Sequence, residues 1–482
     1  MSKTLLACLA IVAVFASCSG DKTQIVSAEL PPMYPDYTDI TIPRNIAPLN
    51  FLMPDTARKV SVYIDSQLFS TSRGCEVTFS LSEWHTLLDQ HVGDTLSVLV
   101  KVIYSDVCVE YQPFFWFVAP EPVDPYLTYR LIEPDYEVFS RVVLEERCVE
   151  NFDTKQFADY QRVGNRCMNC HTYGNQDSRL SMFYVRGQGG GAVLNRGDKL
   201  SLLDINLPGM VSPSVYFGFH PSGRYIVFSS NHIIPAFHSA GGKRLEVFDV
   251  ASDVYVADLD ERTILAVPQL TDSLWLETFP TFAPDGSCIY FCTARVVDFR
   301  NDLESLQYRL CRVGFNDDGS VDNQVDTIFV AGTSVCHPRV SPDGQYLLYT
   351  VQDFGTFPIW HRESDLRMLN LRTMNVDSLD CVNSDKSDTY HSWSSNGRWF
   401  VFASKRDDGL YGKPYFSYFD SAGVAHKPFV LPQKHPRFYH NCLKSFNAPE
   451  LGRGALPFDT DDIAELLKNG RIDGFSYKQN AK

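Results

Sequence analysis

The chain of 482 residues is short of basic side chains, with 43 lysines and arginines against 58 aspartates and glutamates. The net charge of −15 leaves no cation surplus to neutralise phosphates, which excludes nucleic acid as a partner. Long apolar runs are scarce as well, and the run at residues 5–15 is shorter than the ~20 residues a transmembrane helix needs. No carboxylate pair and no Ser, His and Asp pattern predicts a hydrolase.

The first residues have the pattern of an export signal. One lysine precedes the apolar run at 5–15, which has the length of a signal-peptide core. The segment FASC that follows is similar to a bacterial lipobox, in which Cys18 becomes the lipidated first residue. We therefore expect a signal peptide over 1–17, lipidation of Cys18 and a tether over 18–27. An ordinary secretory signal cut nearby is the alternative.

Residues 166–172 read RCMNCHT and contain Cys167, Cys170 and His171. This spacing is that of a c-type haem attachment site, where two thiols form thioethers with the vinyl groups and the adjacent imidazole binds iron. A zinc site would need two further ligands nearby, and a thioredoxin-like site would need a helix N-terminus after a strand. Neither pattern is present, so a structural disulfide or a chance match remains the alternative to one covalent haem c.

The other cysteines do not form a recognisable disulfide framework. Thirteen are present, and nine remain after Cys8, Cys18 and the two motif cysteines are set aside. An odd number cannot all pair. Cys288 and Cys292 lie four apart on a predicted strand, roughly 13 Å from each other, so they share neither an ion nor a disulfide.

Four segments repeat one pattern, a turn ending in glycine followed by alternating apolar residues. This indicates strand-turn-strand units, because glycine allows the positive φ of a tight hairpin. The glycines are spaced by 63, 58 and 53 residues, which fits one four-stranded propeller blade per unit. The segments are HPSGRYIVFSS, APDGSCIYFCT, SPDGQYLLYTV and SSNGRWFVFAS, aligned on Gly223, Gly286, Gly344 and Gly397.

The repeats predict an all-β protein dominated by a β-propeller of about six blades. We place the propeller at 121–450, closed by a strand from one terminus, with the RCMNCHT segment at the hairpin position of an early blade. Alternating strands at 28–120 predict a β-sandwich domain before it. The segment TDDIAELLKNG predicts a capped helix in a C-terminal tail over 451–482.

The glycine repeats resemble the TolB-type β-propeller family with its WD40-like blades. A closer resemblance covers nearly the whole mature chain and is to exported lipoproteins that combine such a propeller with one Cys-x-x-Cys-His. It implies haem binding but no particular reaction. The segments that carry it are NRCMNCHTY, ETFPTFAPDG, GTFPIWHRESDL and YHSWSSNGRWFVFASKRDDGLY.

The flanks of the motif lack the helices of a separate cytochrome c domain, so the haem would rest on the propeller with His171 as one iron ligand. The coordination position of the iron opposite His171 could be filled by Met182, by His238 or by water. A methionine between apolar neighbours is also a common core residue. His220, His337, His361 and His391 each fit a structural role when taken singly, and the glycine-rich segment RGQGGGAVLNRG is expected to be a hairpin.

These features favour an exported, lipid-anchored c-type haem protein that passes single electrons to a protein partner, with the propeller as docking platform. Its expected location is the periplasmic side of a bacterial membrane, with the outer membrane favoured. A haem enzyme of peroxidase or nitrite-reductase type is the first alternative. A binding scaffold with a structural or sensor haem is the second. Iron coordination distinguishes them, because six protein-filled positions favour electron transfer.

Overall fold

The computed structural model describes residues 22–133, 141–237, 245–329 and 332–478. The chain divides into two compact units. The first comprises Met1–Pro122, Glu150–Phe152 and Lys427–Cys442, and the second comprises Val123–Val149, Asp153–His426 and Leu443–Lys482. The C-terminal tail therefore belongs to the second unit, whereas a short segment from the end of the predicted propeller belongs to the first.

The first unit, for which the sequence predicts a β-sandwich, contains a branched seven-stranded sheet, a two-stranded sheet and helix α1 (Leu81–Gln90). Trp84 of α1 packs edge-on against Trp116, with ring centroids 5.4 Å apart. Ser80 and Glu83 have the spacing of a capping box, a signal that indicates this helix in the sequence. The large sheet contains β1 (Thr23–Val26), β2 (Ile40–Pro43), β4 (Lys59–Ile64), β5 (Gln67–Arg73), β7 (Thr95–Ile103), β8 (Val107–Glu110) and β9 (Phe114–Ala119). The remaining elements are β3 (Phe51–Leu52), β6 (Glu76–Val77), β32 (Phe429–Val430) and α2 (Phe438–Asn441).

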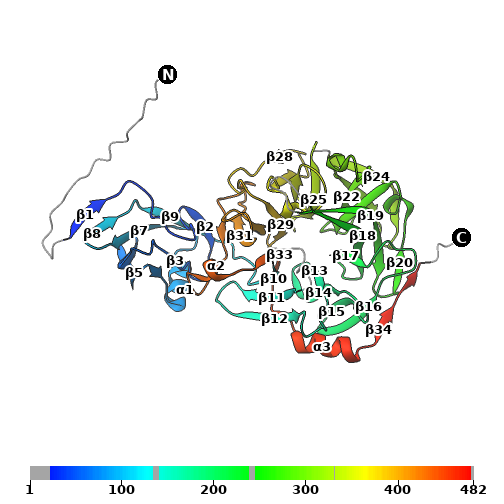
Figure 1. Cartoon of the computed structure of the whole chain (residues 1–482), viewed down its shortest axis with the longest axis horizontal. Helices are drawn as coiled ribbons and strands as arrows, with labels where there is room; N and C mark the ends of the chain where they lie inside the picture. The colour runs from blue at the N-terminus through cyan, green and yellow to red at the C-terminus, as the bar shows by residue number, and fades with distance from the viewer. Residues whose placement is uncertain (1–21, 134–140, 238–244, 330–331, 479–482) are drawn as a thin grey trace, which may run out of the picture. The chain divides into compact units, whose positions relative to one another are not determined.

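The second unit is a six-bladed β-propeller, which confirms the predicted fold (Figure 1). Blade 1 is closed by a strand from the C-terminal part of the chain, because β33 (Ser445–Gly452) pairs antiparallel with β10 (Tyr126–Ile132). The other strands of blades 1 to 3 are β11 (Val143–Cys148) and β12 (Thr154–Asp159); β13 (Met168–Gly174), β14 (Asp177–Val185), β15 (Gly191–Arg196) and β16 (Lys199–Asp204); and β17 (Ser214–Phe219), β18 (Tyr225–Phe237), β19 (Leu245–Asp258) and β20 (Thr263–Leu265).

Blades 4 to 6 follow the same order from the innermost strand outward. Their strands in this unit are β21 (Trp275–Phe282), β22 (Cys288–Arg295), β23 (Arg309–Phe315) and β24 (Val321–Phe329); β25 (Ser334–Val340), β26 (Tyr346–Gln352), β27 (Asp365–Asn370) and β28 (Val376–Asp377); and β29 (Asp388–Trp393), β30 (Trp399–Ser404) and β31 (Lys413–Tyr418). Short 3-10 turns lie at Pro268–Leu270, Leu303–Ser305 and Pro358–Trp360.

The repeated glycines lie in the hairpin turns as predicted, each with φ between 65° and 78°. The Cys-x-x-Cys-His motif does not, and this position was wrongly predicted. Cys170 and His171 lie on β13, and the hairpin turn of blade 2 comes later, at Asn175 and Gln176. The error arises because the interval between blades 2 and 3 is shorter than the intervals between the glycine repeats.

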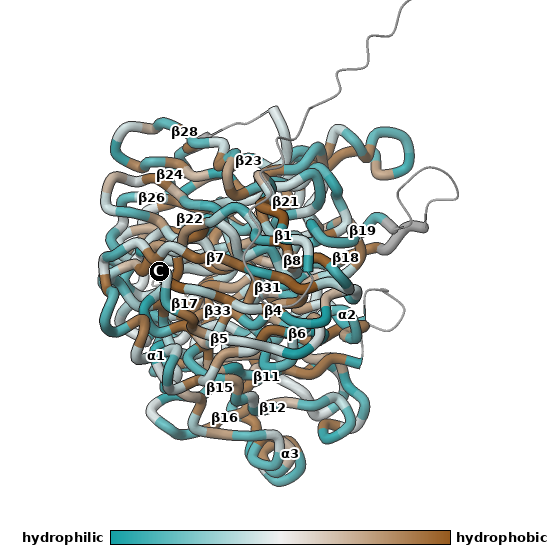
Figure 2. Tube along the Cα trace, turned by 90° about the vertical axis from the view of Figure 1, so that its left-hand side faces the viewer, coloured by the Kyte–Doolittle hydropathy of each residue, from teal (hydrophilic) through white to brown (hydrophobic). Residues whose placement is uncertain are grey.

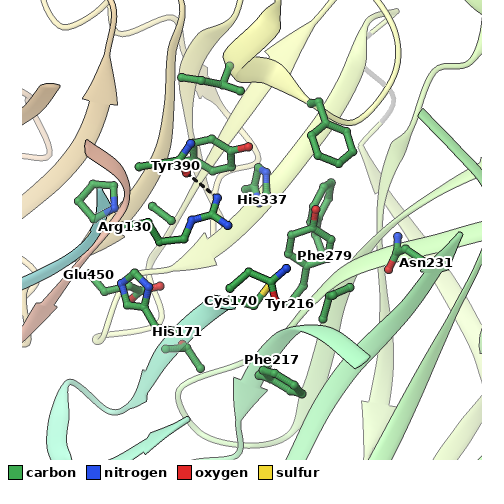
Figure 3. Close-up of a pocket in the computed structure, with 18 of the residues that line it drawn as sticks. Arg130, Cys170, His171, Tyr216, Phe217, Asn231, Phe279, His337, Tyr390 and Glu450 are labelled. Carbon is green, nitrogen blue, oxygen red and sulfur yellow. Dashed lines mark hydrogen bonds between the residues drawn. The ribbon is translucent and has the colours of Figure 1, made fainter. Parts of the chain in front are cut away.

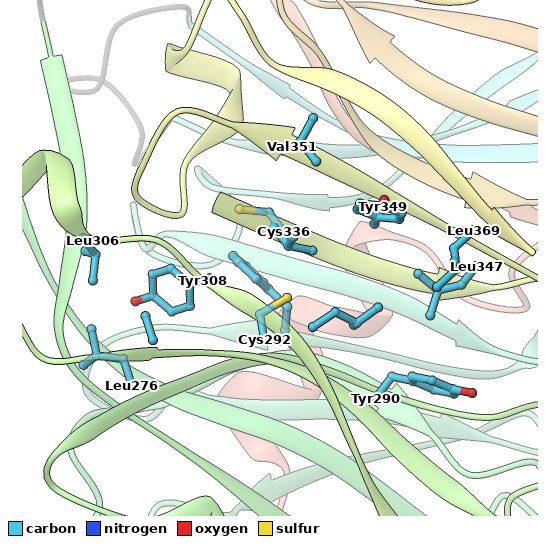
Figure 4. Packing of buried hydrophobic residues seen from close by; sticks show 14 of the residues in the cluster. Leu276, Tyr290, Cys292, Leu306, Tyr308, Cys336, Leu347, Tyr349, Val351 and Leu369 are labelled. Carbon is cyan, nitrogen blue, oxygen red and sulfur yellow. The ribbon is translucent and has the colours of Figure 1, made fainter. Parts of the chain in front are cut away.

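Apolar clusters between neighbouring blades hold the propeller together. Figure 4 shows one of them, where Cys292 of blade 4 and Cys336 of blade 5 lie fully buried among leucine and tyrosine side chains. Both of these cysteines are free thiols. Figure 2 shows hydrophobic residues concentrated on strands, with hydrophilic residues in many connecting loops.

The tail packs on the outside of the propeller. Helix α3 (Thr460–Asn469) begins with a capping box between Asp459 and Asp462 and ends before Gly470, as its sequence predicts. The last two strands, β34 (Ile472–Gly474) and β35 (Ser476–Tyr477), pair in parallel with the outer strands β16 and β20. Within the described residues, no helix is long and apolar enough to cross a bilayer.

Candidate functional site

The innermost strand of every blade carries a β-bulge at the same place. At each bulge two residues oppose a single residue on the neighbouring strand. The first bulge residue has φ between 48° and 56°, a conformation uncommon for side chains of this size. These first residues are Cys170, Tyr216, Phe279, His337, Tyr390 and Ala448. In blade 2 the bulge therefore lies within the haem-type motif, at Cys170 and His171.

The bulges bring side chains from successive blades together into an aromatic collar, which we define as Tyr216, Phe279, His337 and Tyr390. Ring centroids are 4.5 Å apart for Tyr216 and Phe279, 3.9 Å for Phe279 and His337, and 4.9 Å for His337 and Tyr390. Backbone strain of this kind is held where the surrounding structure fixes it, and it concentrates at functional sites.

A cavity of about 290 Å³ lies beside the collar and is lined by the inner strands (Figure 3). Cys167, Cys170 and His171 all line it, so the structure brings the three motif residues to one site. His337 and His391 line the same cavity. Its volume is near the lower limit of cavities that take small organic ligands.

His171 is the most unusual group of this wall. It is 7% exposed, and neither ring nitrogen has a hydrogen-bond partner among the described residues. Burial, together with the charge of Arg130, lowers the pKa of His171 to about 3, and the Thr128 main chain opposes this shift. The imidazole is therefore neutral near pH 7, which is the form that binds a metal.

The two motif thiols are also held in their neutral form. Burial raises the pKa of Cys167 and of Cys170, and the charges of Arg186 and Arg130 oppose this only in part. The site therefore offers two thiols and one imidazole with no charge among them. No group of three or more histidine, cysteine or acidic side chains that could hold a metal ion occurs in the described ranges.

Met182, which the sequence offers as a second iron ligand, does not lie in the cavity wall with the motif residues. Met182 is 1% exposed and packs in the core shared by blades 2 and 3, with Tyr184, Phe217 and Phe228. Its side chain is not part of the cavity wall. His238, like Cys18, lies outside the described residues. Met182 therefore has the packing role that its apolar neighbours indicate.

The sequence analysis of single histidines did not predict that His337 and His391 line the same cavity as the motif. A signal was present, because Tyr216, Phe279, His337 and Tyr390 all precede their turn glycine by the same number of residues. The other two histidines are structural. His220 bonds Ser222 within a hairpin turn at 2.8 Å, and His361 is buried between Glu246 and Glu363 at 3.2 and 2.8 Å.

Comparison with known proteins shows no matching family model and no significant match among curated proteins. Solved structures with similar folds include a TolB from Agrobacterium tumefaciens, at 16% identity and a TM-score of 0.34, covering 55% of this chain and 83% of that one. An oligogalacturonate lyase in complex with manganese has 13% identity and a TM-score of 0.36, covering 63% and 72%. Prolyl oligopeptidase B from Galerina marginata has 13% identity and a TM-score of 0.35, covering 64% and 45%. At this level of similarity none of them assigns a function.

The buried histidines predict a loss of stability in acid. Burial lowers the pKa of His391 to about 3, so folding keeps it neutral where the unfolded chain takes up a proton. The contribution of each such histidine to the free energy of unfolding is fully present above pH ~6.5. It decreases by about 1.4 kcal/mol for each pH unit as the pH falls toward 3. We expect His391→Gln, which can keep the bond to the Leu348 carbonyl, to lose stability less steeply between pH 6 and 4 in urea unfolding. Parallel curves for wild type and variant would contradict this assignment.

Proposed function

We propose that this protein is an exported c-type haem protein that binds one haem covalently in the propeller and transfers single electrons to a protein partner. The observation that carries the proposal is the meeting of Cys167, Cys170 and His171 on the wall of one cavity, with both His171 ring nitrogens buried and unsatisfied. A buried polar atom without a partner is costly unless a ligand satisfies it.

The residues present fit a haem in their chemistry. Cys167 and Cys170 would hold the porphyrin through thioethers, and the neutral His171 would bind the iron. The aromatic collar offers flat apolar surfaces beside them. When bound, the haem supplies one-electron redox chemistry at its iron. The chain contributes orientation and exclusion of water, and six rigid blades supply the scaffold.

We favour His337 as the second iron ligand in place of Met182. The Nε2 atom of His337 is buried, has no partner among the described residues and belongs to a side chain that lines the cavity. Met182 lies in the core between two blades. A second protein ligand closes the iron to small molecules and favours electron transfer over the enzyme or sensor alternatives, and two imidazoles give a lower potential than methionine does.

The export pattern supports anchoring of this protein by a lipid on Cys18, on the periplasmic side of a bacterial membrane and by preference the outer one. A redox protein partner there would accept or donate the electron. The tether over 18–27 would leave the folded units free to meet it.

Covalent attachment is tested by expressing the protein with the cytochrome c maturation machinery and denaturing it. Wild type is expected to retain haem on the unfolded polypeptide, Cys167→Ala and Cys170→Ala to lose most of it, and His171→Ala to keep it with altered iron coordination. Cys288→Ala serves as control, because Cys288 is a half-buried free thiol on β22, outside the cavity. Wild-type protein that releases all its haem on denaturation would refute the proposal.

The second ligand is tested by the optical spectrum of the oxidised protein. A low-spin spectrum is expected for wild type and for Met182→Ala, and its conversion to high spin for His337→Ala. Loss of the low-spin signal in Met182→Ala alone would restore methionine as the ligand. A high-spin wild type that binds cyanide readily would instead support the enzyme or sensor alternatives.

Membrane anchoring is tested by fractionation of cells that produce wild type or Cys18→Ala. Wild type is expected in the membrane fraction and Cys18→Ala in the soluble fraction, because the variant lacks the residue that carries the lipid. Equal distribution of the two proteins would leave only an ordinary secretory signal.

A further inference from the structure

Arg130 brings a positive charge to the cavity that the haem proposal leaves unexplained. It lies on β10 and lines the cavity between the motif and the collar (Figure 3). Its Nη2 donates to the Asn447 side-chain oxygen at 2.9 Å, and its Nε is buried with no partner among the described residues. The guanidinium therefore has donors left over on the side of the cavity.

No carboxylate neutralises this charge within the part of the chain that the structure describes. Glu450, an acidic side chain in the cavity wall, is paired with Arg339 at 2.9 Å. Arg186 also lines the cavity, and with the Asn169 amide turned so that its oxygen faces the guanidinium, the Arg186 Nε and Nη2 donate to that oxygen at 3.1 and 3.2 Å. Besides Arg339, which Glu450 pairs, two guanidinium groups thus line a cavity in a chain whose net charge is −15.

The charge of Arg130 acts on both the motif and the collar. Burial raises the pKa of Cys170 and raises that of Tyr390 to about 12, and Arg130 lowers both. Apart from Glu450, no acidic side chain lines the cavity among the described residues, so the wall itself does not balance the guanidinium. Arg130 is half-buried with its Nε enclosed and unpartnered, and a partly desolvated charge without a counterion is unfavourable, so an anion is expected to complete the site.

We propose that Arg130 is the carboxylate-binding residue of this cavity and that its ligand carries the carboxylate on a flat apolar ring. A guanidinium can donate two parallel hydrogen bonds to a carboxylate, which gives both charge and geometry. The aromatic collar accounts for the flat ring, because its side chains offer stacking and edge contacts next to the charge.

Two sources share this chemistry. One is the haem itself, whose propionates are carboxylates on a flat ring, and this form rests on the proposed function. The other is a diffusible aromatic acid that enters the cavity independently of haem. The experiment therefore has one arm without haem and one with it.

The haem-free arm uses the double variant Cys167→Ala, Cys170→Ala, with benzoate as probe and benzamide as its uncharged counterpart. Benzoate is expected to raise the melting temperature of the propeller and benzamide is not. Adding Arg130→Gln is expected to weaken benzoate binding at least about tenfold, the loss expected for one charged hydrogen-bonded pair. The control is Arg367→Gln, because Arg367 pairs with Asp365 at 3.1 Å outside the cavity and should leave benzoate binding unchanged.

The haem-loaded arm separates the two sources. If a propionate occupies Arg130, benzoate has no effect on the loaded protein, and Arg130→Gln lowers the reduction potential because a positive charge near the iron is lost. If the ligand is diffusible, benzoate binds the loaded protein as well. The inference is overturned if the haem-free protein does not distinguish benzoate from benzamide and Arg130→Gln leaves the potential of the loaded protein unchanged. Should no haem be attached at all, the haem-free arm still decides the role of Arg130.

Discussion

The site depends on one backbone feature, the β-bulge that the innermost strand of every blade repeats. A residue with positive φ interrupts the alternation of the strand and places neighbouring side chains against the central cavity. In four blades this position carries Tyr216, Phe279, His337 or Tyr390, and in blade 2 it carries Cys170. The motif and the collar are thus the same structural position in different blades, which is why they meet without any dedicated domain.

Burial then sets the chemistry of the groups that the bulges bring together. Desolvation keeps His171 and His391 neutral, with pKa values of about 3, and keeps the motif thiols protonated. A neutral imidazole with a free lone pair is a metal ligand, whereas a protonated one is not. The guanidinium groups of Arg130 and Arg186 lie in the same wall, so the cavity places cationic groups beside neutral metal-ligand atoms.

The sequence predicts the propeller because its signals are local. Gly223, Gly286, Gly344 and Gly397 mark hairpin turns, and the alternation after them marks strands, so blade number and strand order follow. The site itself is less accessible to prediction, because the bulge positions share no residue type, and their constant spacing before the turn glycines marks them only as equivalent positions. That His337 and Arg130 line one cavity appears only when strands far apart in the chain are placed around it. Met182 was the reverse case, a neighbour in sequence that packs into the core.

If Cys167 and Cys170 carry one haem, the peptide that contains both cysteines is covalently modified. Protein purified after expression with the maturation machinery is denatured and digested, and the mass of the peptide spanning residues 167–171 is measured. We expect a peptide heavier by one haem, joined through both cysteines. A peptide with two free thiols, or with a disulfide between them, would contradict it.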